Sequence, residues 1–315
     1  MSYPAATRLT QPEAAGGRSS RPPRTPVANL PGPMRMALVT CERPSERDED
    51  VDFLAPALRR KGVDVETPAW SDERVDWRSF DLVKLSSPWD YHERPKDFQR
   101  WLKAVAKASN LQNPLPVVEW NFDKRYLREL DEGGVATIQT VWSEPGGEAK
   151  AIAELERLGW EQVIIKPVVD LSAMNLVRVP MDMAGRMLEN FDRPVLMQPY
   201  LDSIEGAGEL SLVFVAGEYS HSLRKVPARG DFRVQPIYGG THTPAEPTAD
   251  ERRIAERAVA LAPGDPMYSR VDIVADGEGN PLVIELELIE PSLYLDVHPP
   301  AAVRLADEML ARAAS

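Results

Sequence analysis

Runs of apolar residues alternate with longer amphipathic segments from residue 34 onward, and this alternation predicts a protein that mixes strands and helices. In the first third of the chain, three short apolar runs are typical of buried strands: 36–40, 63–66 and 81–85. Two segments have the helical period: 51–61, which Gly62 ends, and 95–108. This order predicts a small open α/β sheet with right-handed crossovers. Ligands of such sheets lie beyond the carboxyl ends of the strands, where the loop at 86–91 is expected.

The same patterns continue in a second region up to residue 201 and in a third region up to the end of the chain. The second region predicts strands at 137–142, 162–169, 177–179 and 195–200, with helices at 123–132, 148–158 and 183–190. The third is richer in strands, at 210–216, at 219–226 and on both sides of a turn at 276–280, and closes with a helix at 301–313. We therefore predict an α+β chain with an N-terminal α/β lobe at 34–116, followed by lobes at 117–201 and 202–315.

The first 33 residues have a different composition from the remainder of the chain. They are rich in Pro, Gly, Ser, Ala and Arg and contain few large apolar side chains. Such a segment cannot bury enough apolar surface to offset the entropy lost on ordering. We expect 1–33 to be a disordered extension.

Composition excludes several classes of protein. The chain of 315 residues has a formal net charge of −12, which makes it a poor general partner for nucleic acid or anionic membranes. Its one cysteine, Cys41, rules out an intrachain disulfide and is expected to be a small buried residue at the end of a strand. No apolar run is long enough to cross a membrane, and the N-terminus lacks a hydrophobic signal core, so a cytoplasmic location is expected.

Motifs of other enzyme classes are absent from the sequence. It contains neither the P-loop motif nor the glycine-rich dinucleotide fingerprint, and it lacks the G-x-S-x-G nucleophile elbow. The four histidines are spaced unlike the ligands of a zinc site. Catalysis by a covalent serine or cysteine nucleophile is therefore not indicated.

Acidic residues alternate with apolar residues in the last two predicted strands. Arg270 and Asp272 share one face of the first strand, and Glu285 and Glu287 share one face of the second. The apolar residues of the second strand, Ile284, Leu286 and Leu288, are expected on the opposite face. If the strands pair, three carboxylates crowd together, and a hard cation would relieve their repulsion. The alternative is a half-exposed hairpin whose acids lie in water.

Several basic residues lie in unusual surroundings for surface cations. Lys166 follows an apolar run and is expected to be half buried, so it needs an anionic partner, and Lys124 opens a predicted helix. A basic group within an acidic protein suits a phosphate or carboxylate ligand. Its members are Arg224, Lys225, Arg229 and Arg233. Ordinary lysines with exposed tips and a solvated basic loop are the alternatives.

Taken in order, these segments resemble the ATP-grasp superfamily, in which two α+β lobes close on ATP. The resemblance covers about residues 35–310 and points to the branch of prokaryotic glutathione synthetases, and within it to the O-ureido-serine cyclo-ligases of cycloserine biosynthesis. The motifs that carry it are Trp89-Asp-Tyr91, Trp120-Asn-Phe-Asp-Lys-Arg-Tyr-Leu127, Ile165-Lys-Pro167, Gln198-Pro-Tyr200, Gly208-Glu-Leu-Ser-Leu-Val-Phe214, Ser220-His-Ser-Leu-Arg-Lys-Val-Pro227, Asp231-Phe-Arg-Val-Gln235, Gly239-Gly240, Arg270-Val-Asp272 and Glu285-Leu-Glu-Leu-Ile-Glu-Pro-Ser-Leu293.

The resemblance implies a role for each matching residue. Lys124 and Lys166 would hold the phosphates of ATP, while Glu209 would meet the ribose. The backbone of Gln198, Pro199, Tyr200 and Leu201 would meet adenine. Asp272, Glu285 and Glu287 would bind one or two Mg²⁺ ions, which Mn²⁺ can replace. Lys225, Arg233 and Arg270 would stabilise the transferring phosphoryl group.

The activity that the resemblance implies is ADP-forming ligation of carbon to nitrogen. A carboxyl or ureido-type group of a small amino-acid-like substrate would be activated as an acyl-phosphate and attacked by a nitrogen. A homodimer is a further expectation, and neither a membrane nor a nucleic acid is an expected partner. Two alternatives stay open at this point: an amide-bond ligase, either glutathione-synthetase-like or peptide-modifying, and an ATP-binding module without turnover.

Overall fold

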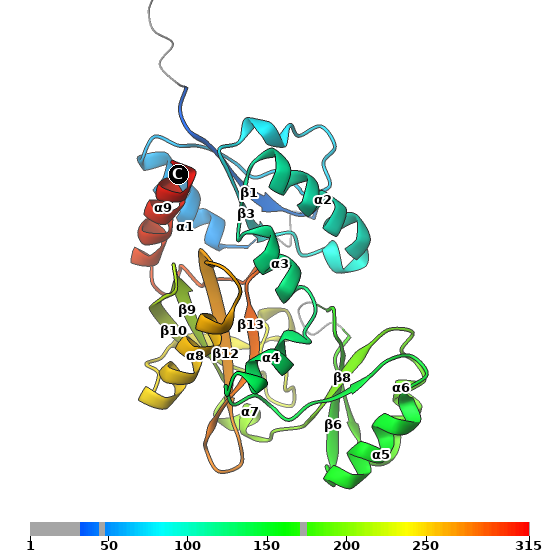
Figure 1. Cartoon of the computed structure of the whole chain (residues 1–315). Helices are drawn as coiled ribbons and strands as arrows, with labels where there is room; N and C mark the ends of the chain where they lie inside the picture. The colour runs from blue at the N-terminus through cyan, green and yellow to red at the C-terminus, as the bar shows by residue number, and fades with distance from the viewer. Residues whose placement is uncertain (1–31, 44–47, 171–174, 315) are drawn as a thin grey trace, which may run out of the picture. The chain divides into compact units, whose positions relative to one another are not determined.

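A computed structural model describes residues 32–43, 48–170 and 175–314 of the chain. The predicted extension at 1–33 lies almost wholly outside the described residues. Residues 33–315 form one compact unit. Within it, the described strands form three sheets (Figure 1).

The N-terminal sheet is parallel, as the strand and helix pattern predicts. Its strands lie in the order β2-β1-β3-β4. They are β1 (Arg35–Thr40), β2 (Asp64–Glu66), β3 (Leu82–Ser87) and β4 (Asn110–Gln112). Helices α1 (Asp50–Arg60) and α2 (Pro95–Ala108) connect the strands, with short 3₁₀ turns η2 (Trp77–Ser79) and η3 (Tyr91–Glu93). Phe98, Leu102 and Val105 of α2 are buried, and their spacing is that of one face of a helix.

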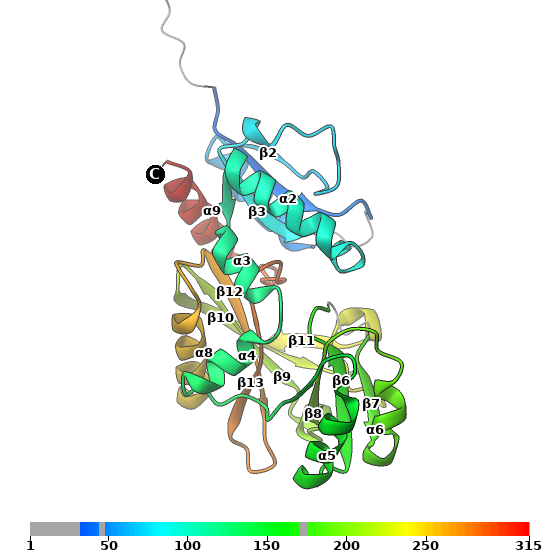
Figure 2. The ribbon, with the colours of Figure 1, turned by 45° about the vertical axis from the view of Figure 1, so that its right-hand side comes forward.

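The second sheet is antiparallel and lies in the order β5-β8-β6-β7. Its strands are β5 (Val141–Ser143), β6 (Gln162–Pro167), β7 (Val177–Pro180) and β8 (Val195–Pro199). Helices α5 (Glu148–Leu158) and α6 (Met181–Leu188) lie side by side on one face of this sheet (Figure 2). The helices α3 (Leu115–Asn121) and α4 (Tyr126–Glu132) precede it.

The third sheet carries most of the predicted acidic and basic residues. Its strand order is β11-β10-β9-β12-β13, and each neighbouring pair is antiparallel. The strands are β9 (Glu209–Val215), β10 (Glu218–Val226), β11 (Thr241–Pro244), β12 (Tyr268–Ala275) and β13 (Pro281–Glu287). The short helix α7 (Ser203–Gly206) precedes β9, and the 3₁₀ turn η4 (Pro236–Tyr238) precedes β11.

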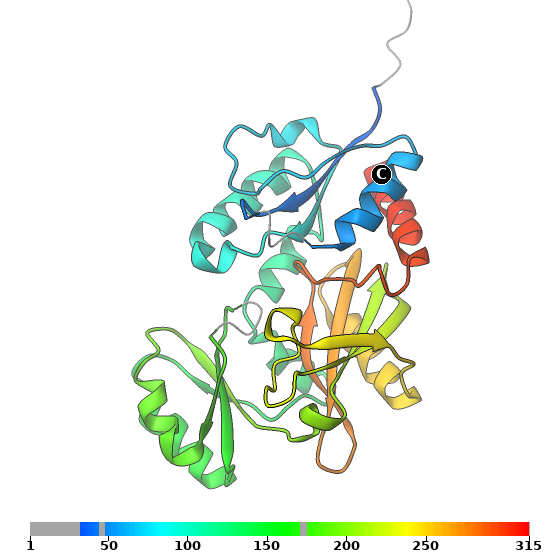
Figure 3. The ribbon, with the colours of Figure 1, turned by 180° about the vertical axis from the view of Figure 1, so that it is seen from behind.

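Two longer helices complete the fold. Helix α8 (Ala249–Leu261) packs on the apolar face of β12 and β13, and α9 (Pro300–Ala313) lies beside α1 (Figure 3). The first and last elements of the compact unit therefore pack together, because α9 shares a buried cluster with α1, β1 and β9.

Some predicted boundaries were wrong. The helix expected at 123–132 begins only at Tyr126, so Lys124 lies in the turn before α4 and does not open a helix. The strand expected at 137–142 is reduced to β5, and α8 was missed. A signal for α8 was present, because Thr248 and Glu251 form a capping box at its N-terminus.

Candidate active site

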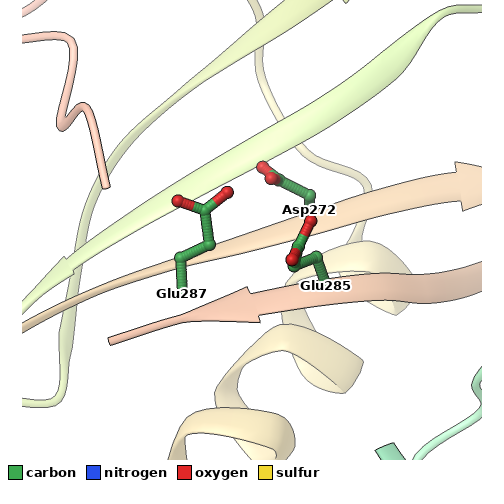
Figure 4. A group of neighbouring side chains, drawn as sticks. All are labelled: Asp272, Glu285 and Glu287. Carbon is green, nitrogen blue, oxygen red and sulfur yellow. The ribbon is translucent and has the colours of Figure 1, made fainter. Parts of the chain in front are cut away.

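Pairing of β12 with β13 gathers three carboxylates on one sheet face. Asp272 lies opposite Glu285, and Arg270 lies opposite Glu287. One carboxylate oxygen from each of Asp272, Glu285 and Glu287 lies within 4.8 Å of the others (Figure 4). The predicted cluster of Asp272, Glu285 and Glu287 is therefore present in the fold, and its oxygen-only donor set suits Mg²⁺.

One neighbour of this cluster was predicted wrongly. A register shift lies between Asp272 and Ile273, which pair with Glu285 and Val283, so Ile284 is the extra residue of a bulge. Ile284 is half buried and lines a cavity beside Glu285, whereas Leu286 and Leu288 are part of the buried core. The side chains of β13 do not alternate strictly between the two faces here, because the bulge adds one residue that has no partner on β12.

Buried cations neutralise the carboxylate cluster. Arg270 Nη2 lies 2.9 Å from Asp272 Oδ2 and also pairs with Glu287. Lys225 Nζ lies 3.4 Å from Asp272 Oδ1, and the Ser211 hydroxyl donates to the same oxygen at 2.5 Å. Although burial opposes it, the attraction of Arg270 and Lys225 holds the pKa of Asp272 well below its usual range. For Glu287, burial outweighs Arg270 and raises the pKa to about 8.

Glu209 and Lys225 form a second buried ion pair on adjacent strands. Their register places them directly opposite each other on β9 and β10. Gly208 precedes this pair at φ +73°, and a Cβ atom there would lie 2.2 Å from the carbonyl oxygen of Lys225. Only glycine permits this close approach of the strands, which brings the Lys225 ammonium beside both Glu209 and Asp272.

The two predicted lysines line the same cavity, but only Lys124 forms an ion pair among the described residues. Lys124 Nζ lies 2.7 Å from Glu285 and donates to the Asp170 carbonyl at 3.0 Å. Lys166 is 6% exposed, and among the described residues no carboxylate lies within ion-pairing distance of its Nζ. Burial lowers the pKa of Lys166. A buried ammonium without a paired carboxylate indicates an anionic ligand.

The predicted adenine segment ends strand β8 at the cavity wall. Gln198 is buried and donates to the Thr140 hydroxyl at 3.0 Å, and Pro199 is the last residue of β8. Arg178 lies over the ring of Tyr200 at 3.4 Å from its centroid. Gln198, Pro199, Tyr200 and Leu201 all line a cavity of about 710 Å³, which also includes the carboxylate cluster and both lysines. This volume is typical of small-molecule sites.

The predicted basic group does not stay together. Lys225 and Arg233 line the cavity, and Arg233 lies 2.8 Å from Asp231 and stacks on the Tyr238 ring at 3.6 Å. Arg224 contacts the Ala207 carbonyl and Glu251 on the other face of β10, and Arg229 is exposed. Strand alternation separates Arg224 from Lys225, so the expectation of one basic site was wrong for Arg224 and Arg229.

Sequence reasoning missed a group of buried residues where the N-terminal sheet meets the cavity. Asp48, Asp50 and Glu290 line the cavity and are buried, and Lys84 is buried on β3. The predicted loop at 86–91 does reach this place, because Trp89 and Tyr91 line the cavity. A signal was available in Glu290, a charged residue between the apolar Leu288-Ile289 and Pro291.

Comparisons with known proteins agree with this arrangement. Residues 36–113 match the family model of the N-terminal domain of D-cycloserine synthetase DcsG, and residues 146–277 match that of the ATP-grasp domain of prokaryotic glutathione synthetase. Solved structures of the same fold include D-alanine–D-alanine ligase from Bacillus anthracis, with a TM-score of 0.67 at 16% identity over 89% of this chain and 97% of that one. The fold therefore defines the class of the ATP-grasp ligases.

Greater similarity links the chain to one branch of this class. It is 32% identical over 300 residues to the cycloserine biosynthesis protein DcsG of Streptomyces lavendulae, covering 88% of this chain and 98% of the relative. The crystal structure of D-cycloserine synthetase DcsG superposes with a TM-score of 0.80 at 31% identity, over 89% of this chain and 99% of that one. A glutathione synthetase of Prochlorococcus marinus is 28% identical over 82% of this chain and 91% of the relative. The chain belongs to the DcsG family of ATP-grasp ligases.

The predictions of superfamily, fold class and ligase activity are thus confirmed. ATP and Mg²⁺ are typical of the family, and solved structures of this fold include complexes with ATP and with Mg and ADP. Among the described residues, no helix is both long and apolar enough to cross a membrane.

Proposed function

We propose that this ligase activates the carboxyl group of a small amino-acid-like substrate with ATP and Mg²⁺, and closes a ring by attack of a nitrogen within the same molecule. The reaction would be that of an O-ureido-serine cyclo-ligase. The observation that carries the proposal is that the acidic cluster, Lys124 and Lys166 line one and the same cavity. The similarity to the cycloserine biosynthesis protein over 98% of that protein supports the substrate class.

Each cavity residue has a proposed part in binding. Lys166, without a paired carboxylate among the described residues, holds phosphate oxygens of ATP together with Lys124. Glu209 binds the ribose, and the segment from Gln198 to Leu201 binds adenine. Asp272, Glu285 and Glu287 hold one or two Mg²⁺ ions, which supply charge neutralisation to the phosphates when bound.

The proposed chemistry depends on positively charged side chains that are already in position before the reaction begins. An oxygen of the substrate carboxylate attacks the γ-phosphorus of ATP and ADP leaves, which yields an acyl-phosphate. The nitrogen then forms the new carbon–nitrogen bond as phosphate departs. Lys225, Arg233 and Arg270 stabilise the negative charge that develops on the phosphoryl oxygens. Arg270 is held rigidly by Asp272 and by the Ser292 carbonyl at 3.0 Å, so little reorganisation is needed.

The experiment is an ADP-release assay with ATP, Mg²⁺ and O-ureido-D-serine, followed by mass spectrometry of the product. A cyclo-ligase forms ADP with this single substrate, and the product is a ring. ADP that appears only with two separate substrates, an acid and an amine, would replace the proposal with a linear amide-bond ligase. Thermal stabilisation by Mg·ATP without ADP from any such substrate would contradict it. We further propose a cytoplasmic location, which suits an ATP-dependent biosynthetic ligase, and a homodimer stays a prediction.

A further inference from the structure

The carboxyl group of Glu290 has one oxygen that is satisfied and one that is not. Glu290 follows β13 and is 5% exposed. Its Oε1 accepts a hydrogen bond from the Tyr91 hydroxyl at 2.8 Å, and Trp89 Nε1 donates to its main-chain oxygen at 3.3 Å. Its Oε2 is buried and has no hydrogen-bond partner among the described residues. A buried acceptor without a donor is costly, so the group indicates a missing ligand.

Cations near Glu290 are engaged elsewhere. Lys124 pairs with Glu285, and Arg270 pairs with Asp272 and Glu287. Lys84 donates to the Leu85 carbonyl at 2.8 Å. Within the described part of the chain, no cation forms an ion pair with Glu290, and burial raises its pKa to about 7. Lys124 and Arg270 attract the Glu290 carboxylate from beyond ion-pairing distance, and this attraction does not offset the effect of burial.

The surroundings of Glu290 select the kind of ligand. It lines the cavity together with the buried Asp48 and Asp50, so carboxyl groups rather than cationic side chains gather at this end of the cavity. Asp50 is already occupied, because it accepts the backbone N–H groups of Leu293 and Leu295. A metal ion needs several oxygen ligands together, and within the described residues only Asp272, Glu285 and Glu287 form such a group. An N–H donor with a positive charge fits one free carboxylate oxygen better.

We propose that Glu290 binds the amino group of the substrate through its Oε2, so that the substrate is an amino-acid derivative with a free amine close to the carboxyl group that is activated. This inference rests on the proposed function and assigns a binding role that the acidic cluster cannot supply. Glu290 is separated from Glu287 by only two residues, so an ammonium at Glu290 and a carboxylate at the metal cluster can belong to one small molecule.

The experiment is calorimetric titration of the full chain in the presence of Mg²⁺ and a non-hydrolysable ATP analogue. The two ligands are O-ureido-D-serine and 3-(ureidooxy)propanoate, which has hydrogen in place of the amine. Wild-type protein should bind the amine-bearing compound roughly 10- to 100-fold more tightly, as is typical of a hydrogen bond to a charged group.

Glu290→Gln keeps the shape and an acceptor for Tyr91 but places an amide NH₂ where Oε2 lies. The preference for the amine should fall to about threefold or less, while affinity for the ATP analogue is unchanged. The control Glu278→Gln, in the exposed turn between β12 and β13, should keep the wild-type preference. A full preference in Glu290→Gln would overturn the inference, as would wild-type protein that binds both compounds equally or neither.

ADP release separates this inference from the proposed function. Wild-type protein that prefers the amine in the titration but forms no ADP from O-ureido-D-serine contradicts the proposed reaction and supports the role of Glu290. Conversely, ADP release with equal binding of the two compounds supports the reaction and overturns the role of Glu290. The wild-type comparison tests the inference even if the Glu290→Gln protein does not fold.

Discussion

Lys124 Nζ lies 2.7 Å from a carboxylate oxygen of Glu285, and this contact joins the turn before α4 to strand β13 of the third sheet. The pair brings together a proposed phosphate ligand and a proposed metal ligand. Each neutralises the other in the ligand-free protein, which raises the pKa of Lys124 and lowers that of Glu285 against the opposing effect of burial. Binding of Mg·ATP would exchange this contact for Lys124 to phosphate and Glu285 to metal, so nucleotide and metal should bind together.

Stabilisation by ATP should therefore require the metal. Saturating ATP with Mg²⁺ is expected to raise the free energy of unfolding by ~2–3 kcal/mol at about a hundredfold excess over the dissociation constant. Thermal unfolding with ATP and Mg²⁺, compared with ATP and EDTA, measures this. Equal melting temperatures in the two conditions would contradict the role of the acidic cluster.

Glu287 and Glu278 belong to the same hairpin but should respond differently to substitution. Glu287 is half-buried beside Asp272 and Glu285, and burial raises its pKa, so Glu287→Gln removes a carboxylate whose charge is unfavourable. The ligand-free protein should therefore be as stable as wild type or more stable. Its stabilisation by Mg·ATP should shrink sharply and turnover should fall by orders of magnitude. Glu278→Gln, in the exposed turn, should change the unfolding free energy by no more than about 0.5 kcal/mol, with or without Mg·ATP. It should leave turnover unchanged. Identical responses of the two variants would mean that Glu287 lies on an ordinary wet surface.

Glu285→Gln should differ from Glu287→Gln in the absence of ligand. The change removes the partner of the half-buried Lys124 ammonium, and the cost is expected to be about 1–3 kcal/mol of unfolding free energy. Denaturant unfolding of both variants without nucleotide measures the contrast. The ion pair has no role in stability if both proteins unfold at the wild-type midpoint.

Lys166 should lower the stability of the ligand-free protein while it supports nucleotide binding. Its ammonium is buried without a paired carboxylate among the described residues, so Lys166→Met is expected to leave stability unchanged or raise it by about 1 kcal/mol. The affinity for Mg·ATP should fall at least about tenfold, because a charged contact to phosphate is lost. Lys150→Met, on the exposed side of α5, is the matched control for both measurements. An unchanged affinity in Lys166→Met would exclude Lys166 from the nucleotide site.

The carboxyl group of Glu290 should make the stability of the ligand-free protein depend on pH. Its pKa is raised by burial to about 7, so the folded state holds this proton more tightly than the unfolded state does. That contribution is complete below the unfolded pKa of about 4.5 and is lost as the pH rises through 7. Glu290→Gln lacks the effect, so its stability relative to wild type should increase between pH 5 and pH 8, by up to about 3 kcal/mol. Parallel stability curves for the two proteins would show that Glu290 does not titrate in this range.

Much of the fold follows from local patterns. Helix α2 and helix α5 have the bounds that the helical period predicts, and the strands β1, β3, β10 and β12 lie where the apolar runs indicate. The short helices α3 and α7 were missed. Each has only a few residues, too few for the period of a helix to be recognised in the sequence.

The sequence predicts correctly which candidate site residues share a face when they lie on the same regular strand. Alternation puts Arg270 and Asp272 on one face because successive side chains of a strand point to opposite sides. The same rule wrongly placed Ile284, because a bulge is a property of two paired strands and leaves no mark on one of them.

What the sequence by itself determined is the order of elements and the identity of the charged residues, because the spacing of apolar residues that distinguishes a helix from a strand is a local property of the chain. Tertiary structure alone decided which charges from distant segments meet. Lys124 contacts Glu285, and Tyr91 contacts Glu290, across 161 and 199 positions of the chain. The unsatisfied Oε2 of Glu290 likewise depends on Tyr91 and on the cavity wall. Burial and electrostatic attraction act through space, so they can be assigned only after the chain has brought distant strands and loops together.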